Sequence, residues 1–329
     1  MIICGKTELS VRLYIVLDGF ESCYNRYMET YIIGSILKEY RIRLKISQED
    51  LSAGLCDMST LSRIESGRQI PGRKLVEGLF SKMGMNPPLS AIPMTKNDFK
   101  REQLEYKITD MIAIGKFEIA DMLEEYKNCS DKMSPLEEQF YLFYKTMAED
   151  FFKHDCEKAL ENYAEAMRLT IQDYEIGKIP NVRFLTKTEL LILNNISRTF
   201  YYVGKEDEAI QLMEFLRTYF ETKVMSEEEK AKNYPVILHN LENWYGRANK
   251  DEKVIELCDI GIDICILYGK LTQFPFQVFN KGCSLVKLGK IEEGKKCLSQ
   301  AFSILEAMKE FDNVEYGKKW VTENLGLTF

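Results

Sequence analysis

Asparagine recurs at one position of a repeated pattern in the second half of the chain. Asn195, Asn240 and Asn280 each stand nine residues before the turn residue of their repeat. An asparagine side chain offers both a donor and an acceptor, so a row of three can pair with the amides and carbonyls of an extended peptide, whatever its sequence. The spacing therefore predicts an amide ladder that binds peptide backbone. The alternative is that the repetition reflects only the common ancestry of the repeats.

The helical faces that carry this ladder also offer charged and aromatic side chains. Such a mixture can bind the side chains of a peptide and its carboxylate. The candidate peptide-binding residues are Asn195, Arg198, Tyr202, His239, Asn240, Asn243, Arg247, Gln277, Phe279 and Asn280.

A second group of small polar residues lies near the N-terminus, among short predicted helices. Apolar spacing and turn signals predict helices over 33–44, 48–54, 59–66 and 74–83, with Ser47 as an N-cap and Gly67 as a left-handed C-cap. Two short helices joined by a tight turn are typical of a helix-turn-helix, which places its second helix in the DNA major groove. Residues 31–90 hold nine basic and six acidic side chains, whereas residues 91–329 hold 32 and 41. We therefore expect double-stranded DNA to bind only near residues 31–90.

The segment from Ser47 to Gly67 resembles the helix-turn-helix of phage-repressor type, the XRE family, with Leu51, Leu61 and Ile64 at family positions. The resemblance implies that base edges face Asp57, Met58, Ser59, Ser62 and Arg63, and that phosphates face Gln48 and Arg68. Met58 departs from the long amide common in relatives, which leaves contact with a thymine methyl. The resemblance also implies an ion pair between Arg41 and Glu65.

Beyond residue 97 a pattern of helix, turn and helix recurs. The turns begin at Gly115, His154, Gly204, Asn249 and Gly289, and a small residue or valine follows five positions later. The pattern resembles the tetratricopeptide repeat. Residues 308–327 are expected to form a terminal cap over the last repeat.

These patterns predict an all-α chain: a helix-turn-helix bundle followed by a tetratricopeptide-like superhelix. We expect an N-terminal extension over 1–27, a DNA-binding domain over 28–86, a linker over 87–96 that contains Pro87, Pro88 and Pro93, and the repeat domain with its cap over 97–329.

Other classes of function find little support. There is no phosphate-binding glycine loop or nucleophile elbow, and neither a cysteine nor a serine has a plausible histidine base, so we expect no enzyme and no cofactor. Two distant histidines and nine scattered cysteines without a Cys-x-x-Cys pair argue against a metal site and a disulfide framework. Neither a membrane span nor a secretion signal is evident, and we expect a cytoplasmic protein.

The combination resembles the Rgg/PlcR group of peptide-responsive transcription regulators, also called the RRNPP group. The resemblance implies a homodimer that binds DNA and senses a short signalling peptide on its concave face. The alternative is a helix-turn-helix regulator whose repeats bind a protein partner or only dimerise, without a peptide ligand.

Overall fold

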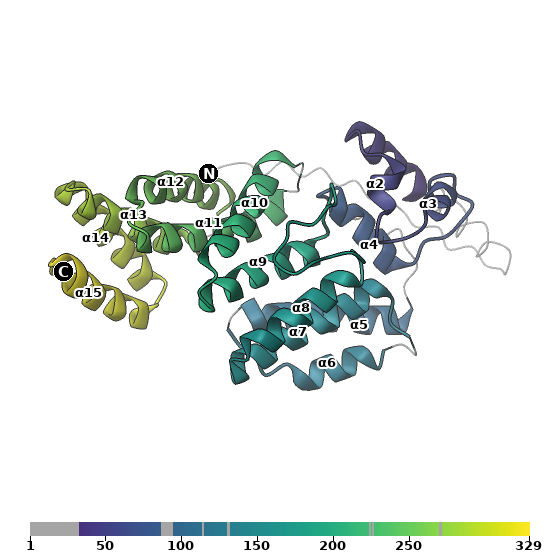
Figure 1. The fold of residues 1–329 in the computed structure, drawn as a ribbon, viewed down its shortest axis with the longest axis horizontal. Coiled ribbons are helices and arrows are strands. Elements are labelled where there is room, and N and C mark those ends of the chain that lie inside the picture. Colours follow the sequence, from purple (N-terminus) through teal and green to yellow (C-terminus); the bar gives the residue numbers. More distant parts are fainter. Residues whose placement is uncertain are drawn as a thin grey trace, which may run out of the picture.

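The computed structural model describes residues 33–86, 95–113, 115–129, 132–223, 225, 227–269 and 272–329. Within these ranges the regular structure is entirely α-helical (Figure 1). Residues 33–43 form the first helix. The others are α2 (Gln48–Ser52), α3 (Met58–Glu65), α4 (Arg73–Lys82), α5 (Lys96–Ala113), α6 (Ala120–Lys127), α7 (Pro135–Lys153), α8 (Cys156–Arg168), α9 (Lys187–Tyr202), α10 (Glu206–Thr222), α11 (Glu227–Arg247), α12 (Asp251–Tyr268), α13 (Phe274–Lys287), α14 (Ile291–Ala307) and α15 (Phe311–Leu325).

The first helices surround a small core of their own. Leu37, Leu51, Leu61 and Leu79 are at most 2% exposed and belong to one cluster of buried residues. The helix limits differ slightly from the prediction, because α2 ends at Ser52 and α3 already begins at Met58. This bundle places α3 on its outer side, beside α2.

The repeat array follows as consecutive helix pairs, from α5 and α6 to α13 and α14 (Figure 1). All five expected turn residues have the left-handed backbone, with φ between 52° at His154 and 80° at Gly204 and Gly289. The small residues five positions later are buried in four of the five turns, as Ala159, Ala209, Val254 and Gly294, where the paired helices approach closely. Ala120 is exposed, because Ile119 takes the buried position in the first repeat. The predicted all-α fold with tetratricopeptide-like repeats is confirmed for the described residues.

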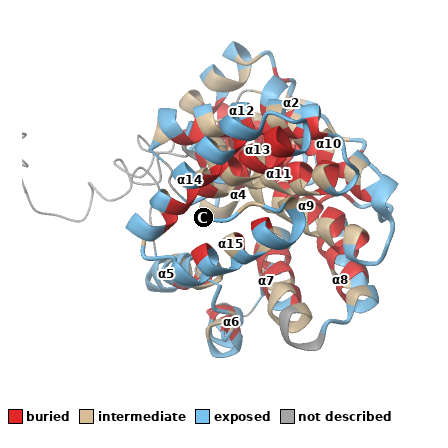
Figure 2. Ribbon diagram, turned by 90° about the vertical axis from the view of Figure 1, so that its left-hand side faces the viewer, coloured by how far each residue is buried: buried red, intermediate tan, exposed pale blue. Residues whose placement is uncertain are grey.

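The array has one large cluster of buried residues, from Leu104 to Ile264, and a second, smaller cluster at its C-terminal end. Figure 2 shows the buried residues on the helix sides that face neighbouring helices. At the C-terminal end, α15 packs through Val314 and Val321 on a separate cluster that includes Leu298 and Phe302. Helix α15 thus covers the end of the stack, as expected for a cap.

The N-terminal bundle contacts the array directly. The amide of Lys187, at the start of α9, donates to Ser81 Oγ at 2.7 Å, and Arg183 pairs with Asp50 at 3.3 Å. A Cβ added to Gly54 would lie 1.9 Å from the carbonyl oxygen of Thr170, so glycine permits this close approach. The expected extension over 1–27 and most of the expected linker, residues 87–94, lie outside the described residues. No helix in the described part of the chain has the length and hydropathy to cross a membrane.

Candidate functional site

Helices α2 and α3 form the two arms of a helix-turn-helix. The Ser47 side chain accepts from the Asp50 amide at 2.9 Å and caps α2. The connection contains Gly54 at φ 73°, and Gly67 at φ 72° ends the unit after α3. Leu61 and Ile64 anchor α3 in the core, with at most 1% of either exposed. The opposite face of α3 therefore points away from the bundle.

That outward face carries the residues expected to read bases. Asp57, Met58, Ser59 and Arg63 are exposed and Ser62 is half-buried. The Arg63 guanidinium donates to Thr60 Oγ1 at 3.1 Å, which lays it along the helix surface. Arg68 is also exposed, and its Nε donates to Ser66 Oγ at 2.9 Å. The structure therefore leaves these six expected residues wholly or partly accessible to solvent.

Gln48 behaves differently from its expected role at a phosphate. Its Nε2 donates to Glu65 Oε2 at 2.8 Å, which ties α2 to α3. Arg41 donates to the same carboxylate through Nε at 2.6 Å and Nη2 at 2.9 Å, so the expected interhelical ion pair is present. The hydrogen bond to Glu65 is the main cause that raises the pKa of Arg41. Glu65 has a side chain only 3% exposed, and Gln48 serves first to satisfy it.

The second site is a groove on the first helices of the last repeats. A hollow of about 480 Å³ lies between α11, α13 and α15. Its wall combines amides, cations and aromatic rings. Among its lining residues are His239, Glu242, Asn243, Arg247, Phe276, Phe279, Asn280, Lys287, Asn313, Tyr316 and Trp320. We call this hollow the groove.

Each of the three ladder asparagines makes a hydrogen bond to a neighbouring residue. Asn195 Nδ2 donates to Leu191 O of its own helix at 2.9 Å. Asn240 Nδ2 donates to Asn194 Oδ1 at 3.2 Å, which links α11 to α9. Asn280 Nδ2 lies 3.1 Å from Glu242 Oε2. Of the three, Asn280 lines the groove, whereas Asn195 and Asn240 are not among its lining residues.

Other expected groove residues surround the ladder. His239 lies 3.0 Å from Asn243 Nδ2, and the Arg247 guanidinium lies 5.6 Å from the ring centre of Tyr201. Tyr202 is 75% exposed and shares a neighbouring hollow with Arg247. Arg198 is half-buried on α9 and lines neither hollow. Phe279 lines the groove and packs against the C-terminal cap.

The prediction that Gln277 binds peptide in the groove is wrong. It is fully buried, and its Nε2 donates to Pro235 O at 3.3 Å. A Cβ added to Gly261 would lie 2.2 Å from this Nε2, so the glycine of α12 leaves the space that the carboxamide fills. Gln277 is therefore an interhelical core residue.

Sequence reasoning missed four residues in or next to the groove. Trp244 stacks on Tyr201 with ring centres 4.5 Å apart and so supports the Arg247 end. Glu242, 1% exposed, lies beneath Asn280. Tyr316 and Trp320 of α15 form one wall. Their four-residue spacing on a helix is a signal for one shared face, but the sequence suggests only a cap there.

Together these features define a class: a helix-turn-helix protein whose DNA-binding module is joined to a tetratricopeptide-like array with a polar groove. Comparison with known proteins agrees, since residues 37–88 match the helix-turn-helix family.

Solved structures extend the likeness to most of the chain. PlcR from Bacillus thuringiensis, in complex with the peptide PapR7 and DNA, is 20% identical with a TM-score of 0.54, over 86% of this chain and 99% of PlcR. Its apo form is 19% identical with a TM-score of 0.55, over 87% and 98% of the two chains. ComR from Streptococcus suis is 14% identical with a TM-score of 0.43, over 88% and 94%. No curated protein matches the sequence. The chain thus shares the PlcR fold.

Proposed function

We propose that this protein is a transcriptional regulator that binds double-stranded DNA through α3 and binds a short peptide in the groove. The observation that carries the proposal is the pairing of an outward-facing recognition helix with a groove rich in amides and aromatic rings in one chain. The solved relative PlcR, which carries both peptide and DNA, supports it.

The groove fits an extended peptide in its chemistry. Asn280 lines the groove, and Asn240 follows the lining residue His239 on α11. Both side chains offer amide groups to a peptide backbone, and Phe279, Tyr316 and Trp320 offer an apolar surface. Arg247 and Lys287 supply positive charge for a carboxylate. Bonds to Asn194 and Glu242 fix the orientation of these amides before a ligand binds, which reduces the entropy lost on binding.

Helix α9 offers a physical route between the two sites. Its first amide bonds to Ser81 of α4, and its later turns carry Asn195 and Tyr202. A peptide that shifts α9 would therefore act on the DNA-binding bundle, provided that it binds two arrangements with different affinity. We also propose a homodimer, because two copies of α3 would then read two half-sites of an operator.

The test begins with a displayed library of random heptapeptides, selected on the full-length protein. The selected peptide is titrated by calorimetry into the parent and into Asn240→Ala, with Asn181→Ala, an exposed loop residue, as the matched control. Losing one of the proposed partners of the peptide backbone costs about 1–3 kcal/mol, so we expect Asn240→Ala to weaken binding about 5- to 150-fold and the control to leave it unchanged.

Two results would favour the alternative, in which the repeats bind a protein partner or only dimerise. One is a library that yields no saturable binder. The other is a binder with equal affinity for the parent and for Asn240→Ala, with helical content unchanged in both.

A further inference from the structure

Glu242 of α11 is a buried carboxylate among the residues that line the groove. Its side chain is 0% exposed. Five Asp and Glu residues are buried in the described part of the chain, and of these Glu242 alone has a buried oxygen, Oε1, without a hydrogen-bond partner. Such a group points to a function, because burying a carboxylate with an unpaired oxygen is costly.

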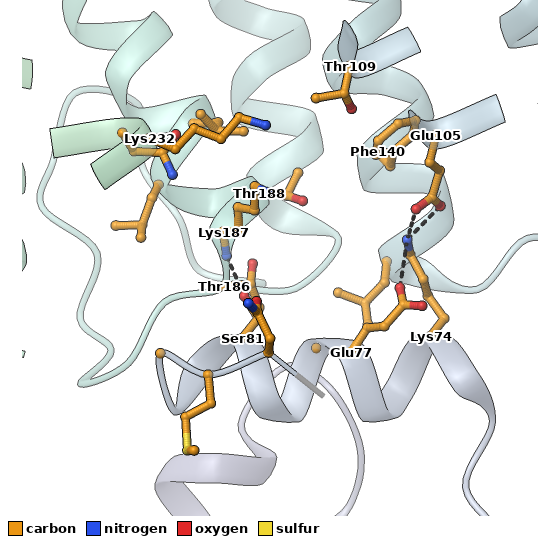
Figure 3. Close-up of a pocket in the computed structure, with 18 of the residues that line it drawn as sticks. Lys74, Glu77, Ser81, Glu105, Thr109, Phe140, Thr186, Lys187, Thr188 and Lys232 are labelled. Carbon is orange, nitrogen blue, oxygen red and sulfur yellow. Dashed lines mark hydrogen bonds and ion pairs between the residues drawn. The ribbon is translucent and has the colours of Figure 1, made fainter. Parts of the chain in front are cut away.

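Two other sites of the protein show the usual pairing of a shielded carboxylate with a cation. In the cavity between the DNA-binding bundle and the repeat array, Lys74 Nζ lies 2.6 Å from Glu105 Oε1 and 3.3 Å from Glu77 Oε2 (Figure 3). The buried Glu65 has Arg41 as its partner, 2.6 Å away. In both places the negative charge is balanced within the protein.

The surroundings of Glu242 balance its charge less well. The basic group within 4.0 Å of it among the described residues is His239, whose Nδ1 lies 3.8 Å from Glu242 Oε2 and which is charged only when protonated. Lys287 lies instead 3.8 Å from Asp251 Oδ1 and donates to a backbone carbonyl. The Cys258 thiol faces Glu242, and its burial together with this carboxylate raises the pKa of the thiol well above its ordinary value. Within the described residues, Glu242 thus forms no ion pair with a lysine or arginine.

Glu242 and its neighbours hold the Asn280 side chain in one orientation. Three atoms that can accept a hydrogen bond converge on Asn280 Nδ2, namely Glu242 Oε2 at 3.1 Å, His239 Nδ1 at 3.4 Å and Asn243 Oδ1 at 3.5 Å. The imidazole nitrogen accepts when the ring hydrogen is on Nε2. Asn280 Oδ1 has no hydrogen bond within the described residues, so this oxygen remains to accept one from a ligand. Asn280 is half-buried and lines the groove, so a ligand in the groove can reach it.

Aromatic rings line the groove near Asn280. Phe276 stands one turn before Asn280 on α13, and its ring centre lies 5.9 Å from that of His239. Phe279 and Trp320 line the same hollow, with ring centres 6.1 Å apart. Aromatic faces attract cations, and a group of rings next to a negative charge is typical of sites that bind an ammonium group.

The positive charge of the groove lies further along α11. Arg247 follows Glu242 by five residues, a rise of about 7.5 Å along the helix axis. Its guanidinium lies over the Tyr201 ring, and Arg247 also lines the neighbouring hollow. The groove therefore has an acidic end at Glu242 and a basic end at Arg247.

We propose that the groove selects peptides that present a primary ammonium, from the amino terminus or from a lysine side chain, to Asn280 next to the buried charge of Glu242. The ammonium donates to Asn280 Oδ1, and the neighbouring apolar part of the ligand contacts Phe276. Glu242 is a positioning residue, because it orients Asn280 and supplies the opposite charge from behind it. This inference rests on the proposed peptide site, since it names the group that one end of that site recognises.

The probe is phenethylamine, in which a short chain joins a primary ammonium to an aromatic ring. Its affinity for the full-length protein is measured by a saturation-transfer NMR titration. The comparison probes are 2-phenylethanol, which lacks the charge, and 3-phenylpropionate, which reverses it. We expect phenethylamine to bind about tenfold more tightly than either. The proposal is overturned if phenethylamine does not bind or if 2-phenylethanol binds equally well.

Variants assign this preference to Glu242. Glu242→Gln keeps the size of the side chain and an acceptor for Asn280 but removes the charge. It should weaken phenethylamine about tenfold and leave 2-phenylethanol unchanged, whereas a purely structural role would change both alike. Phe276→Leu should weaken phenethylamine about threefold through the lost ring face. Glu252→Gln, at an exposed position of α12, is the matched control and should bind like the parent.

Equal phenethylamine affinity in Glu242→Gln and in the parent would also overturn the proposal. If Glu242→Gln does not fold, as judged by its helical content, the comparison of the three probes on the parent protein decides.

The library-selected peptide shows where the ammonium comes from. Either N-acetylation of this peptide or replacement of its lysines by norleucine should weaken its binding about tenfold, and the modification that does so identifies the source. Unchanged affinity after both modifications would contradict the proposal. A selected peptide that binds to a protein with no affinity for phenethylamine would refute this inference alone. Phenethylamine binding without any peptide binder would refute the proposed peptide site and leave the ammonium site standing.

Discussion

The clearest stability test is the removal of Arg41. In the folded protein the Glu65 carboxylate accepts two hydrogen bonds from Arg41 and one from Gln48, and its side chain is only 3% exposed. Arg41→Ala leaves a buried charge with a single neutral donor. Breaking a buried pair in this way costs about 3–5 kcal/mol, a large share of the stability of a small domain.

Hydrogen exchange of the full-length protein measures this loss locally. Protection of the α3 amides should fall by about two to three and a half orders of magnitude, at about 1.4 kcal/mol per factor of ten. Arg43→Ala is the matched control, because Arg43 is exposed and only lies over the Tyr40 ring, 4.6 Å from its centre. The combined replacement of Arg41 by Met and Glu65 by Leu should recover most of the protection. Equal protection in Arg41→Ala and Arg43→Ala would refute the reasoning.

Three further predictions concern DNA, packing and thiol reactivity. Replacing Arg63 by Ala should cost about 1–3 kcal/mol of DNA-binding free energy and relax the base preference for a selected operator. Arg68→Ala should weaken binding to all DNA sequences alike and reduce the dependence of DNA affinity on salt. Equal, sequence-independent losses from both changes would contradict base reading by Arg63. Gly261→Ala should lower the free energy of unfolding, measured in urea, by about 1–3 kcal/mol, because the new Cβ would meet the buried Gln277 carboxamide. Gly246→Ala is the control: its Cβ would lie 3.8 Å from the nearest side-chain atom, so it should be neutral or stabilising. Burial raises the pKa of the Cys283 thiol from near 9 to about 12, so iodoacetamide at pH 8 should modify this thiol only after unfolding. The contribution of Cys283 to the free energy of unfolding should fall as pH rises from about 9 to about 12. Rapid modification of the native protein would contradict the burial.

Local signals predicted much of this architecture. Left-handed backbone is expensive for most residues, so Gly, Asn and a single His at intervals of 39 to 50 residues indicated where each helix pair turns. The turns at His154 and Asn249 have that backbone. The interhelical pair of Arg41 and Glu65 could likewise be expected from the helix-turn-helix string. These features depend on residues close in sequence or on a widely shared motif.

The remaining features depend on contacts that spacing does not reveal. Gln277 shares the helical face of the ladder. Because Gly261 on α12 has no side chain, the Gln277 carboxamide fits into the core between the helices. The bond between Asn240 and Asn194 crosses from α11 to α9, and the contact of Ser81 with the start of α9 joins segments 106 residues apart. Which polar groups form hydrogen bonds across helices therefore depends on how the helices pack in the array.

The most direct test of a peptide-sensing regulator is a thermodynamic cycle. The affinity of a library-selected peptide is measured by calorimetry with the free protein and with the protein saturated by its selected DNA. If groove and α3 are coupled, the peptide affinity should differ between the two states by about 5- to 150-fold, and DNA affinity should change by the same factor when peptide is bound. Equal peptide affinities in the two states, with both ligands bound independently, would contradict the account.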